Sequence, residues 1–402
     1  MNAVSSSRPL PFEGYRVLEL AHLIAGPVCG MYLADMGADV IKVEEPGAGD
    51  ASRSVYHVTL NGEGPLYVTV NRNKRGIALN LSSPDGRQIF YRLAEGADVV
   101  IEAFRGGVAE RLEIDYGRLS RLNPRLIYCS LSAFGPTGPW REKPGLDALV
   151  QAMSGLMAVT GEPDGGPVLC GAPVVDTIGS LLAVQGILTA LLHREKTGEG
   201  QKVDVSLLDG ALLASAARLC VFHVTGEDLP RWGNAHPELV PYQAFRARDG
   251  WIFVAVRTDK LWRSFCRAID RSGLVQDRRF ATKNARLAHR KELVTLLEAV
   301  FSARTVGEWM EILEAADVLC APVHSYSDMV KDAQVIASGM LVEQDHPKAG
   351  RFQTIGIPVK LEKSPGGIRT PSPTLGQHTE EVLRGAGYGD DEIRSLRERG
   401  VI

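Results

Sequence analysis

The sequence of 402 residues holds two carboxylates that each open an otherwise apolar, helical segment. The first is Asp176, which follows the small and apolar residues 171–175 (GAPVV). Free N–H groups and the dipole at a helix N-terminus favour the ionised form of a carboxylate, and covalent catalysis by a carboxylate needs such an ionised, partly buried group. A plain helix cap is the alternative, but the apolar flanks and the space that Gly179 leaves for a ligand favour Asp176 as a nucleophile.

Asp147 is the second of these carboxylates and lies in residues 143–149 (KPGLDAL). It too could be a simple helix cap. Two carboxylates at helix mouths would also suit a general acid–base pair, although their spacing does not show whether they meet. We further expect the backbone N–H groups that follow Asp176 to stabilise an oxyanion.

Basic side chains gather in predicted turns at two places, residues 72–75 (RNKR) and the pair Arg105 and Arg111. Each one alone is typical of a solvated loop. As a group they could meet phosphates, because open α/β sheets bind ligands outside the carboxyl ends of their strands. Phe104 is either a core residue or a platform on which an adenine stacks. No Ser or Cys lies in a nucleophile-elbow context, which argues against an acyl-serine hydrolase.

The elements that would position these residues alternate between strand and helix in the first half of the chain. A strand at 16–20, a helix at 28–36 with Pro27 at its first position, and a strand at 39–43 form a unit typical of a parallel sheet. The same alternation continues at 84–95, 98–102, 117–123 and 126–130. We therefore predict a doubly wound α/β domain, although its first turn lacks the G-x-G-x-x-G fingerprint of dinucleotide sites.

The second half predicts a different arrangement. A long helix runs from just after Asp176 to about His193, with glycines inside it that indicate close packing against a neighbour, before a strand at 202–206 and a helix at 207–223. Residues 241–247 and 251–256 form a hairpin pattern, and helices follow at 259–269, 290–302 and 306–315. The tail is rich in Pro and Gly up to a last helix at 379–385. We expect a large domain over 1–224, a smaller α+β domain over 225–325, and a return of 326–402 to the large domain.

Composition excludes several classes of protein. With 45 Lys and Arg against 48 Asp and Glu the net charge is −3, which gives no reason to expect a nucleic-acid partner. The apolar stretch 181–192 is too short to span a bilayer, and residues 1–11 resemble a loose arm more than a signal peptide. Six widely spaced cysteines favour neither disulfides nor a zinc site. We expect a cytoplasmic protein with no metal and no membrane partner.

Several motifs together resemble class III CoA-transferases, the family that includes formyl-CoA transferase, carnitine CoA-transferase and α-methylacyl-CoA racemase. They occur in the order of the family and span nearly the whole chain. The matching segments are residues 25–27 (AGP), 37–44 (GADVIKVE), 46–50 (PGAGD) with Arg53, 71–75 (NRNKR), 132–135 (SAFG), 196–201 (KTGEGQ) and 375–378 (LGQH).

The resemblance implies a Rossmann-like large domain, a small domain, and an interlocked homodimer of ring-like subunits. Asp176 matches the nucleophile of formyl-CoA transferase, and Asp147 matches its neighbouring carboxylate, a Glu in that enzyme. CoA then binds as part of an acyl-CoA substrate and not as a permanent cofactor, and a small carboxylic acid is the other substrate. Ala25, Leu79, Phe104 and Arg111 match CoA contacts of that enzyme in residue type, whereas Ile24, Glu45, Ser82 and Ala103 stand at contact positions but differ in type. We therefore expect CoA to bind at Ile24, Ala25, Leu79, Ala103, Phe104, Arg105 and Arg111.

Two segments indicate the branch of the family. The racemase branch has a histidine base where this chain has Leu146, which argues against proton transfer at an α-carbon. Residues 231–236 (RWGNAH) and 240–245 (VPYQAF) resemble the succinyl-CoA:glutarate CoA-transferase branch, so we expect succinyl-CoA or another dicarboxyl-CoA as donor. An α-methylacyl-CoA racemase or epimerase and a non-catalytic acyl-CoA binding protein are the alternatives. The loop of His236 is either a lid over the site or an ordinary interdomain loop.

Overall fold

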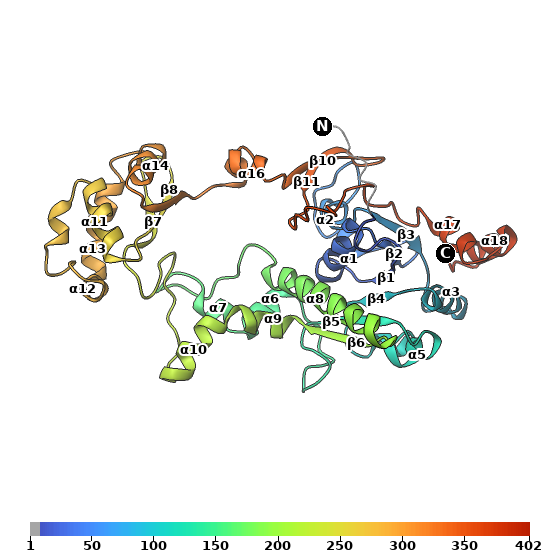
Figure 1. The fold of residues 1–402 in the computed structure, drawn as a ribbon. Coiled ribbons are helices and arrows are strands. Elements are labelled where there is room, and N and C mark those ends of the chain that lie inside the picture. The colour runs from blue at the N-terminus through green and yellow to red at the C-terminus, as the bar shows by residue number, and fades with distance from the viewer. Residues whose placement is uncertain (1–8) are drawn as a thin grey trace. The chain divides into compact units, whose positions relative to one another are not determined.

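The computed structural model describes residues 9–402, and the chain forms two compact units (Figure 1). The large unit contains the residues up to Leu156, Leu169–Thr225 and Gln334–Ile402, and the small unit contains Met157–Val168 and Gly226–Ala333. Of the arm expected at 1–11, residues 1–8 lie outside the described part.

The large unit is built on a six-stranded sheet in the order β3-β2-β1-β4-β5-β6, with every neighbouring pair parallel. Its central strands are rich in Val, Ile and Leu and buried on both faces, as parallel sheets covered by helices are. The predicted α/β class is confirmed. The strands are β1 (Arg16–Leu20), β2 (Asp39–Glu44), β3 (Lys74–Ala78), β4 (Val99–Glu102), β5 (Ile127–Ser132) and β6 (Lys202–Ser206).

Helices cover both faces of this sheet. Helices α1 (Ala25–Asp35) and α8 (Val174–Thr197) pack on one face through side chains such as Cys29 and Ile187. Helices α3 (Pro84–Glu95), α5 (Tyr116–Leu122), α17 (Thr379–Gly385) and α18 (Asp390–Glu398) pack on the other. The strand order reverses between β1 and β4, and α/β sheets of this kind bind ligands at that point, beyond the carboxyl ends of the strands.

The small unit combines an antiparallel sheet with helices, as predicted. Strands β7 (Tyr242–Arg246) and β8 (Trp251–Ala255) form the expected hairpin, and β9 (Leu319–Pro322) pairs with β8. Their apolar face packs on α11 (Asp259–Ala268), α13 (Arg290–Phe301) and α14 (Val306–Ala315), with α12 (Lys283–Ala288) and the 3₁₀ turn η2 (Ser272–Val275) between them.

Residues 157–168 depart from the expected domain limits, because they pack with the small unit. The guanidinium of Arg231 donates hydrogen bonds to the carbonyl oxygens of Ala158, Glu162 and Gly165, and Gly233 N donates to Gly161 O. These bonds between backbone and Arg231 leave no apolar pattern in the sequence from which they could have been predicted.

Four element predictions are corrected. The helix expected at 207–223 breaks at Ser215 into α9 (Leu207–Ala214) and α10 (Ala216–Thr225), which meet at 70°. Helix α1 begins at Ala25, so Pro27 is its third residue. The tail contains the hairpin of β10 (Leu341–His346) and β11 (Gly350–Ile355) as well as α18.

Helix α8 has 24 residues and by length and apolar composition could cross a membrane, a test that the core helix of a globular protein also passes.

The remaining elements are short. They are η1 (Ala51–Arg53), α2 (Pro65–Val70), α4 (Val108–Arg111), α6 (Asp147–Met153), α7 (Leu156–Val159), α15 (Tyr326–Met329) and α16 (Ala333–Ala337).

Candidate active site

A cavity of about 200 Å³ lies in the large unit where the strand order reverses. Its walls are the loops that follow β1, β4 and β5, the first turn of α8, and Leu207 at the start of α9. This is the place at which a doubly wound sheet presents its loops to a ligand. The lining includes His22, Leu23, Ile24, Ala25, Ala103, Phe104, Arg105, Leu131, Phe134, Leu146 and Asp176.

Asp176 is the third residue of α8 and presents its carboxylate to this cavity. Burial raises the pKa of Asp176 to about 7, with a further contribution from the nearby negative charge of Asp147. A carboxylate with this pKa is a stronger base and nucleophile than an ordinary one, yet about half of it is ionised at neutral pH.

Asp147 is the partner that sets the first turn of α8, although it belongs to α6. Its Oδ2 accepts hydrogen bonds from Val175 N at 2.8 Å and from Asp176 N at 3.1 Å. Its Oδ1 accepts from Gln151 Nε2 at 2.5 Å, and Gln151 Oε1 in turn accepts from Cys170 N at 3.1 Å. The structure therefore brings the two predicted carboxylates together, and it makes Asp147 the cap of α8 instead of α6.

These bonds contradict the prediction that backbone N–H groups after Asp176 are free to stabilise an oxyanion. The N–H groups of Val175 and Asp176 are held by Asp147, and Thr177 N donates to Pro173 O at 3.1 Å. Helix α8 begins before Asp176 and not after it, so the amides next to the carboxylate are already committed.

Gly179 also has a different role from the one expected beside a ligand. A Cβ on Gly179 would lie 2.4 Å from Leu207 Cδ2, and one on Gly186 would lie 2.5 Å from Val203 Cγ1. Both glycines therefore allow α8 to approach its neighbours closely, and the predicted close packing is confirmed.

Five of the seven predicted CoA-binding positions line the cavity: Ile24, Ala25, Ala103, Phe104 and Arg105. The other two do not. Leu79 is buried in the core just beyond β3, and Arg111 is exposed at the end of α4.

A second cavity, of about 550 Å³, shares Phe104, Arg105 and Arg141 with the first and extends beside β5 and β6. The two together offer room for a long ligand. Among residues 9–402, no three His, Cys, Asp or Glu side chains come together in a way that could hold a metal ion.

The basic residues at 72–75 are not available for phosphate. They lie at the amino end of β3, opposite the expected end, because that strand begins at Lys74. Arg72 forms a buried ion pair with Asp35 at 2.7 Å, and Arg75 pairs with Asp39 at the same distance. A carboxylate partner therefore neutralises each of these two cations, in a buried pair for Arg72 and a partly exposed one for Arg75.

Sequence reasoning missed two contributors to the site, Gln151 and Ser180. Gln151 bridges Asp147 to Cys170, and Ser180 Oγ contacts both Asp176 O and Ala25 O at 2.8 Å. The spacing of Asp147 and Gln151 places them one turn apart on α6 and could have indicated the first of these contacts. Nothing local indicates the second.

Comparisons with known proteins identify the family of the chain. The model of CoA-transferase family III matches residues 12–379. The chain is similar to the succinyl-CoA:glutarate CoA-transferase of Mus musculus, with 36% identity over 98% of this chain and 90% of the mouse protein. It is also similar to the succinate–glutarate CoA-transferase of Agrobacterium fabrum, with 37% identity over 94% of this chain and 96% of that protein.

Solved structures give the same result. A CAIB/BAIF family protein from Brucella suis has a TM-score of 0.86 and 34% identity, and the match covers 94% of this chain and 100% of that one. The family model spans the sheet, the small unit and the Asp176 cavity alike. The chain belongs to CoA-transferase family III and is an enzyme of that class.

Proposed function

We propose that this enzyme moves CoA from succinyl-CoA or another dicarboxyl-CoA to a carboxylic acid acceptor, through an aspartyl-CoA thioester on Asp176. The observation that carries the proposal is a half-buried carboxylate with a raised pKa, presented to a cavity at the reversal point of the sheet. The dicarboxylate donor is supported by the names of the mouse and bacterial relatives and by residues 231–236 and 240–245.

The first half of the reaction charges the enzyme. The ionised Asp176 attacks the thioester carbonyl of the donor, which forms a mixed anhydride and expels the CoA thiolate. The thiolate then attacks the aspartyl carbonyl and expels the donor acid as its carboxylate, leaving CoA bound to Asp176 as a thioester. No proton is gained or lost overall, and covalent catalysis divides one difficult exchange into two easier steps.

The second half repeats these steps in reverse. The acceptor carboxylate attacks the aspartyl thioester, which forms a second anhydride and releases the thiolate again. The thiolate attacks the acceptor carbonyl of that anhydride, so that acceptor acyl-CoA leaves and Asp176 returns as a carboxylate. Water must stay away from both anhydrides, and the apolar walls contributed by Ile24, Ala25 and Phe134 favour its exclusion.

Asp147 positions the nucleophile in this mechanism. By accepting the N–H groups of Val175 and Asp176 it fixes the first turn of α8, and by its charge it raises the pKa of the Asp176 carboxylate. For CoA we propose Ile24, Ala25, Ala103, Phe104 and Arg105 around the reactive end, with Leu79 and Arg111 as the remaining contacts.

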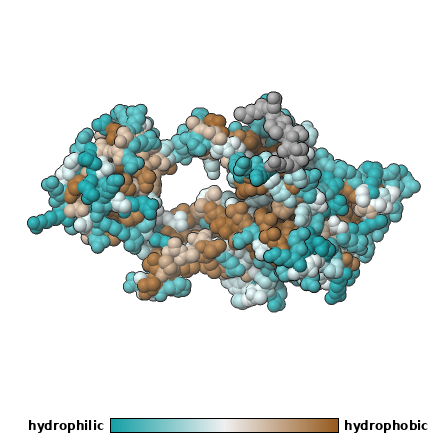
Figure 2. All heavy atoms as spheres, in the orientation of Figure 1, coloured by the Kyte–Doolittle hydropathy of each residue, from teal (hydrophilic) through white to brown (hydrophobic). Residues whose placement is uncertain are grey.

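The large unit also exposes an apolar surface that we propose to be the interface of a homodimer. Helices α6, α8, α9 and α10 leave large apolar side chains open to solvent, and such side chains gather over these helices in Figure 2. Exposed apolar patches of this kind mark interfaces between subunits. The members are Leu146, Leu149, Met153, Leu181, Leu188, Leu192, Leu212, Leu213, Phe222 and Val224.

We place the enzyme in the cytoplasm. All six cysteines are unpaired thiols, two of them exposed, and this state is typical of a reducing compartment.

Covalent labelling tests the proposed function. The enzyme is incubated with succinyl-CoA and then with borohydride or hydroxylamine, and its peptides are mapped by mass spectrometry. We expect modification of Asp176, and we expect Asp176→Ala to lose both the label and CoA transfer while it keeps its fold. Asp209→Ala is the matched control, because Asp209 occupies the same third position in α9 but does not line the cavity.

Two results would contradict the proposal. A label on another residue, or full transfer by Asp176→Ala, would remove Asp176 as the nucleophile. Exchange of an α-hydrogen with deuterated water, in the absence of any acceptor acid, would indicate a racemase instead.

A further inference from the structure

The loop between β1 and α1 forms one wall of the Asp176 cavity, through His22, Leu23, Ile24 and Ala25. Leu23 has φ +65°, a left-handed backbone conformation that a branched, non-glycine residue rarely adopts. Such conformations persist only where the surrounding structure imposes them, and they concentrate at functional sites.

Four buried side chains from distant parts of the sequence bind alternate residues of this loop and of the first turn of α1. Two bind the loop, where Lys42 Nζ donates to Ala21 O at 2.8 Å and Leu23 N donates to Asp50 Oδ1 at 3.0 Å. The third binds the first turn of α1, where Lys74 Nζ donates to Pro27 O at 2.8 Å. The fourth is Ser180, whose hydroxyl contacts Ala25 O at 2.8 Å. All four side chains belong to residues no more than 1% exposed: Lys42, Asp50, Lys74 and Ser180.

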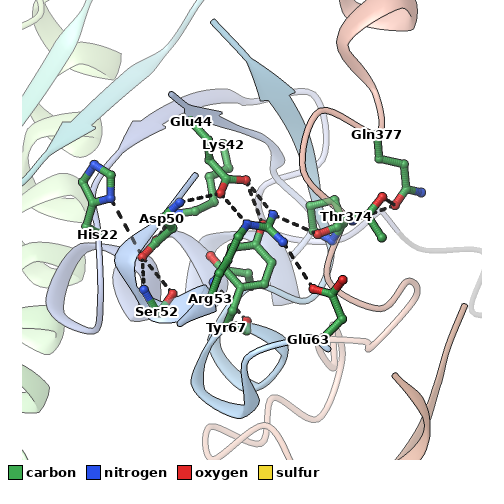
Figure 3. A network of polar contacts seen from close by, with 12 residues as sticks. His22, Lys42, Glu44, Asp50, Ser52, Arg53, Glu63, Tyr67, Thr374 and Gln377 are labelled. Atoms are coloured by element: carbon green, nitrogen blue, oxygen red, sulfur yellow. Dashed lines mark hydrogen bonds and ion pairs between the residues drawn. The ribbon is translucent and has the colours of Figure 1, made fainter. Parts of the chain in front are cut away.

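The charged members of this set hold one another in place. Lys42 forms ion pairs with Asp50 at 2.7 Å and with Glu19 at 2.9 Å, and Glu19 pairs with Lys74 at 2.6 Å. Behind them, Asp50 N donates to Glu44, which pairs with Arg53, as Figure 3 shows. Burial by itself would raise the pKa of Asp50, but the ammonium of Lys42 outweighs it and keeps that pKa well below its usual range.

Ser180 connects the wall to the backbone of the helical turn that carries the nucleophile. Its hydroxyl lies 2.8 Å from Ala25 O in the wall and 2.8 Å from the backbone carbonyl oxygen of Asp176 in the same helix. The wall is therefore tied to α8 at a point one turn from Asp176.

None of these four residues lines the cavity. We propose that Lys42, Asp50 and Ser180 are positioning residues, which hold the 22–25 wall against Asp176 so that acyl groups transfer to a carboxylate and not to water. This rests on the proposed function, and a displacement of about 1 Å at such a wall is enough to cost on the order of 100-fold in rate.

The test compares two variants with two matched controls. Ser180→Ala removes the link between the wall and α8, and Thr189→Ala is its control, because Thr189 donates to Gln185 O within the same helix but holds no loop. Asp50→Asn removes the charge that anchors Leu23, and Glu63→Gln is its control, because Glu63 lies at the far side of the same cluster (Figure 3) and does not touch the loop.

We expect the two variants to transfer CoA about 10- to 100-fold more slowly than the wild type, when each rate is divided by the amount of enzyme that can be labelled on Asp176. We expect the two controls to keep the wild-type rate. We also expect a higher ratio of acyl-CoA hydrolysis to CoA transfer, and faster hydrogen exchange of the 21–27 amides. A purely structural role would lower the melting temperature and leave the ratio of hydrolysis to transfer as it is.

The outcomes separate the two proposals. If the wild-type enzyme transfers CoA and Ser180→Ala matches Thr189→Ala in rate, ratio and exchange, the positioning role is wrong. If Asp50→Asn does not fold, Ser180→Ala alone decides. If the wild-type enzyme transfers no CoA, the proposed function fails, while hydrogen exchange of the loop still shows whether Asp50 and Ser180 hold it.

Discussion

Asp176 and Asp147 form a pair in which one carboxylate controls the proton affinity of the other. Asp147 satisfies the amides of α8, and burial, with a further contribution from the charge of Asp147, raises the pKa of Asp176 to about 7. Only the ionised form can attack a thioester, so the cost of the raised pKa is a fraction of enzyme that is protonated and inactive at neutral pH.

The rate of the first half-reaction should therefore rise with pH through about 7. Below this pKa Asp176 is protonated and cannot attack, and above it the carboxylate is fully ionised. Asp147→Asn removes a like charge, so the midpoint should move to lower pH, whereas Asp209→Asn should leave it in place. Single-turnover release of succinate from succinyl-CoA, measured across the pH range without an acceptor acid, gives both midpoints. A midpoint that Asp147→Asn leaves unchanged would contradict the assigned coupling.

At the scale of single residues, the sequence indicated both carboxylates because each follows small apolar residues at a helix mouth. It could not indicate that Asp147 caps a helix 28 residues further along, since that depends on how α6 docks on α8. The interpretation of residues 72–75 as phosphate ligands failed for a related reason. Their carboxylate partners, Asp35 at the end of α1 and Asp39 at the start of the neighbouring strand β2, are distant in sequence but close in space.

Helix α8, which carries Asp176, packs so closely against its neighbours that some of its positions require glycine. Gly186→Ala should destabilise the enzyme, because the added methyl group would lie 2.5 Å from Cγ1 of Val203, a β-branched residue of β6. Overpacking of this kind costs about 1–3 kcal/mol, which exceeds the ~1 kcal/mol that Ala gains over Gly in a helix.

Chemical denaturation of Gly186→Ala measures this cost. Gly385→Ala in α17 is the control, because a Cβ there meets nothing within 4 Å, and we expect it to be neutral or stabilising. A Gly186→Ala protein as stable as the wild type would show that α8 can shift along the sheet without cost.

At the scale of elements, periodicity predicted the parallel strands and their helices well because both are buried through apolar side chains. It failed where polar patterns or bends intervene. Helix α18 has only Ile393 and Leu396 as buried residues among charged neighbours. The sequences of β10 and β11 show little alternation of apolar and polar residues. The break at Ser215 interrupts an apolar run that continues smoothly in the sequence.

Exposed large apolar side chains gather on α6 and α8–α10, as they do at interfaces between subunits. We expect the enzyme to elute at about twice its chain mass of 43.6 kDa in light-scattering chromatography. Leu213→Glu should shift it toward the monomer, and Leu213 is 63% exposed, so the substitution should not disturb the fold of the chain itself. Leu122→Glu is the control, because Leu122 is exposed alone on α5. A wild-type monomer in solution would exclude the interface.

At this largest scale, the sequence predicted a parallel α/β domain and a smaller α+β domain, and the structure has both kinds of sheet. The strand order could not be read from the sequence, since the same alternation of strands and helices allows several orders. The sequence also did not predict that residues 157–168 belong to the small unit, because hydrogen bonds from Arg231 to their backbone hold them there.

That Asp147 comes from α6 while it caps α8 has a consequence for biosynthesis. Burial in the folded cavity and the charge of Asp147 together raise the pKa of Asp176, so we expect a chain in which α6 and α8 have not packed together to hold an ordinary aspartate at this position. We therefore expect that only a completely folded chain reacts with acyl-CoA.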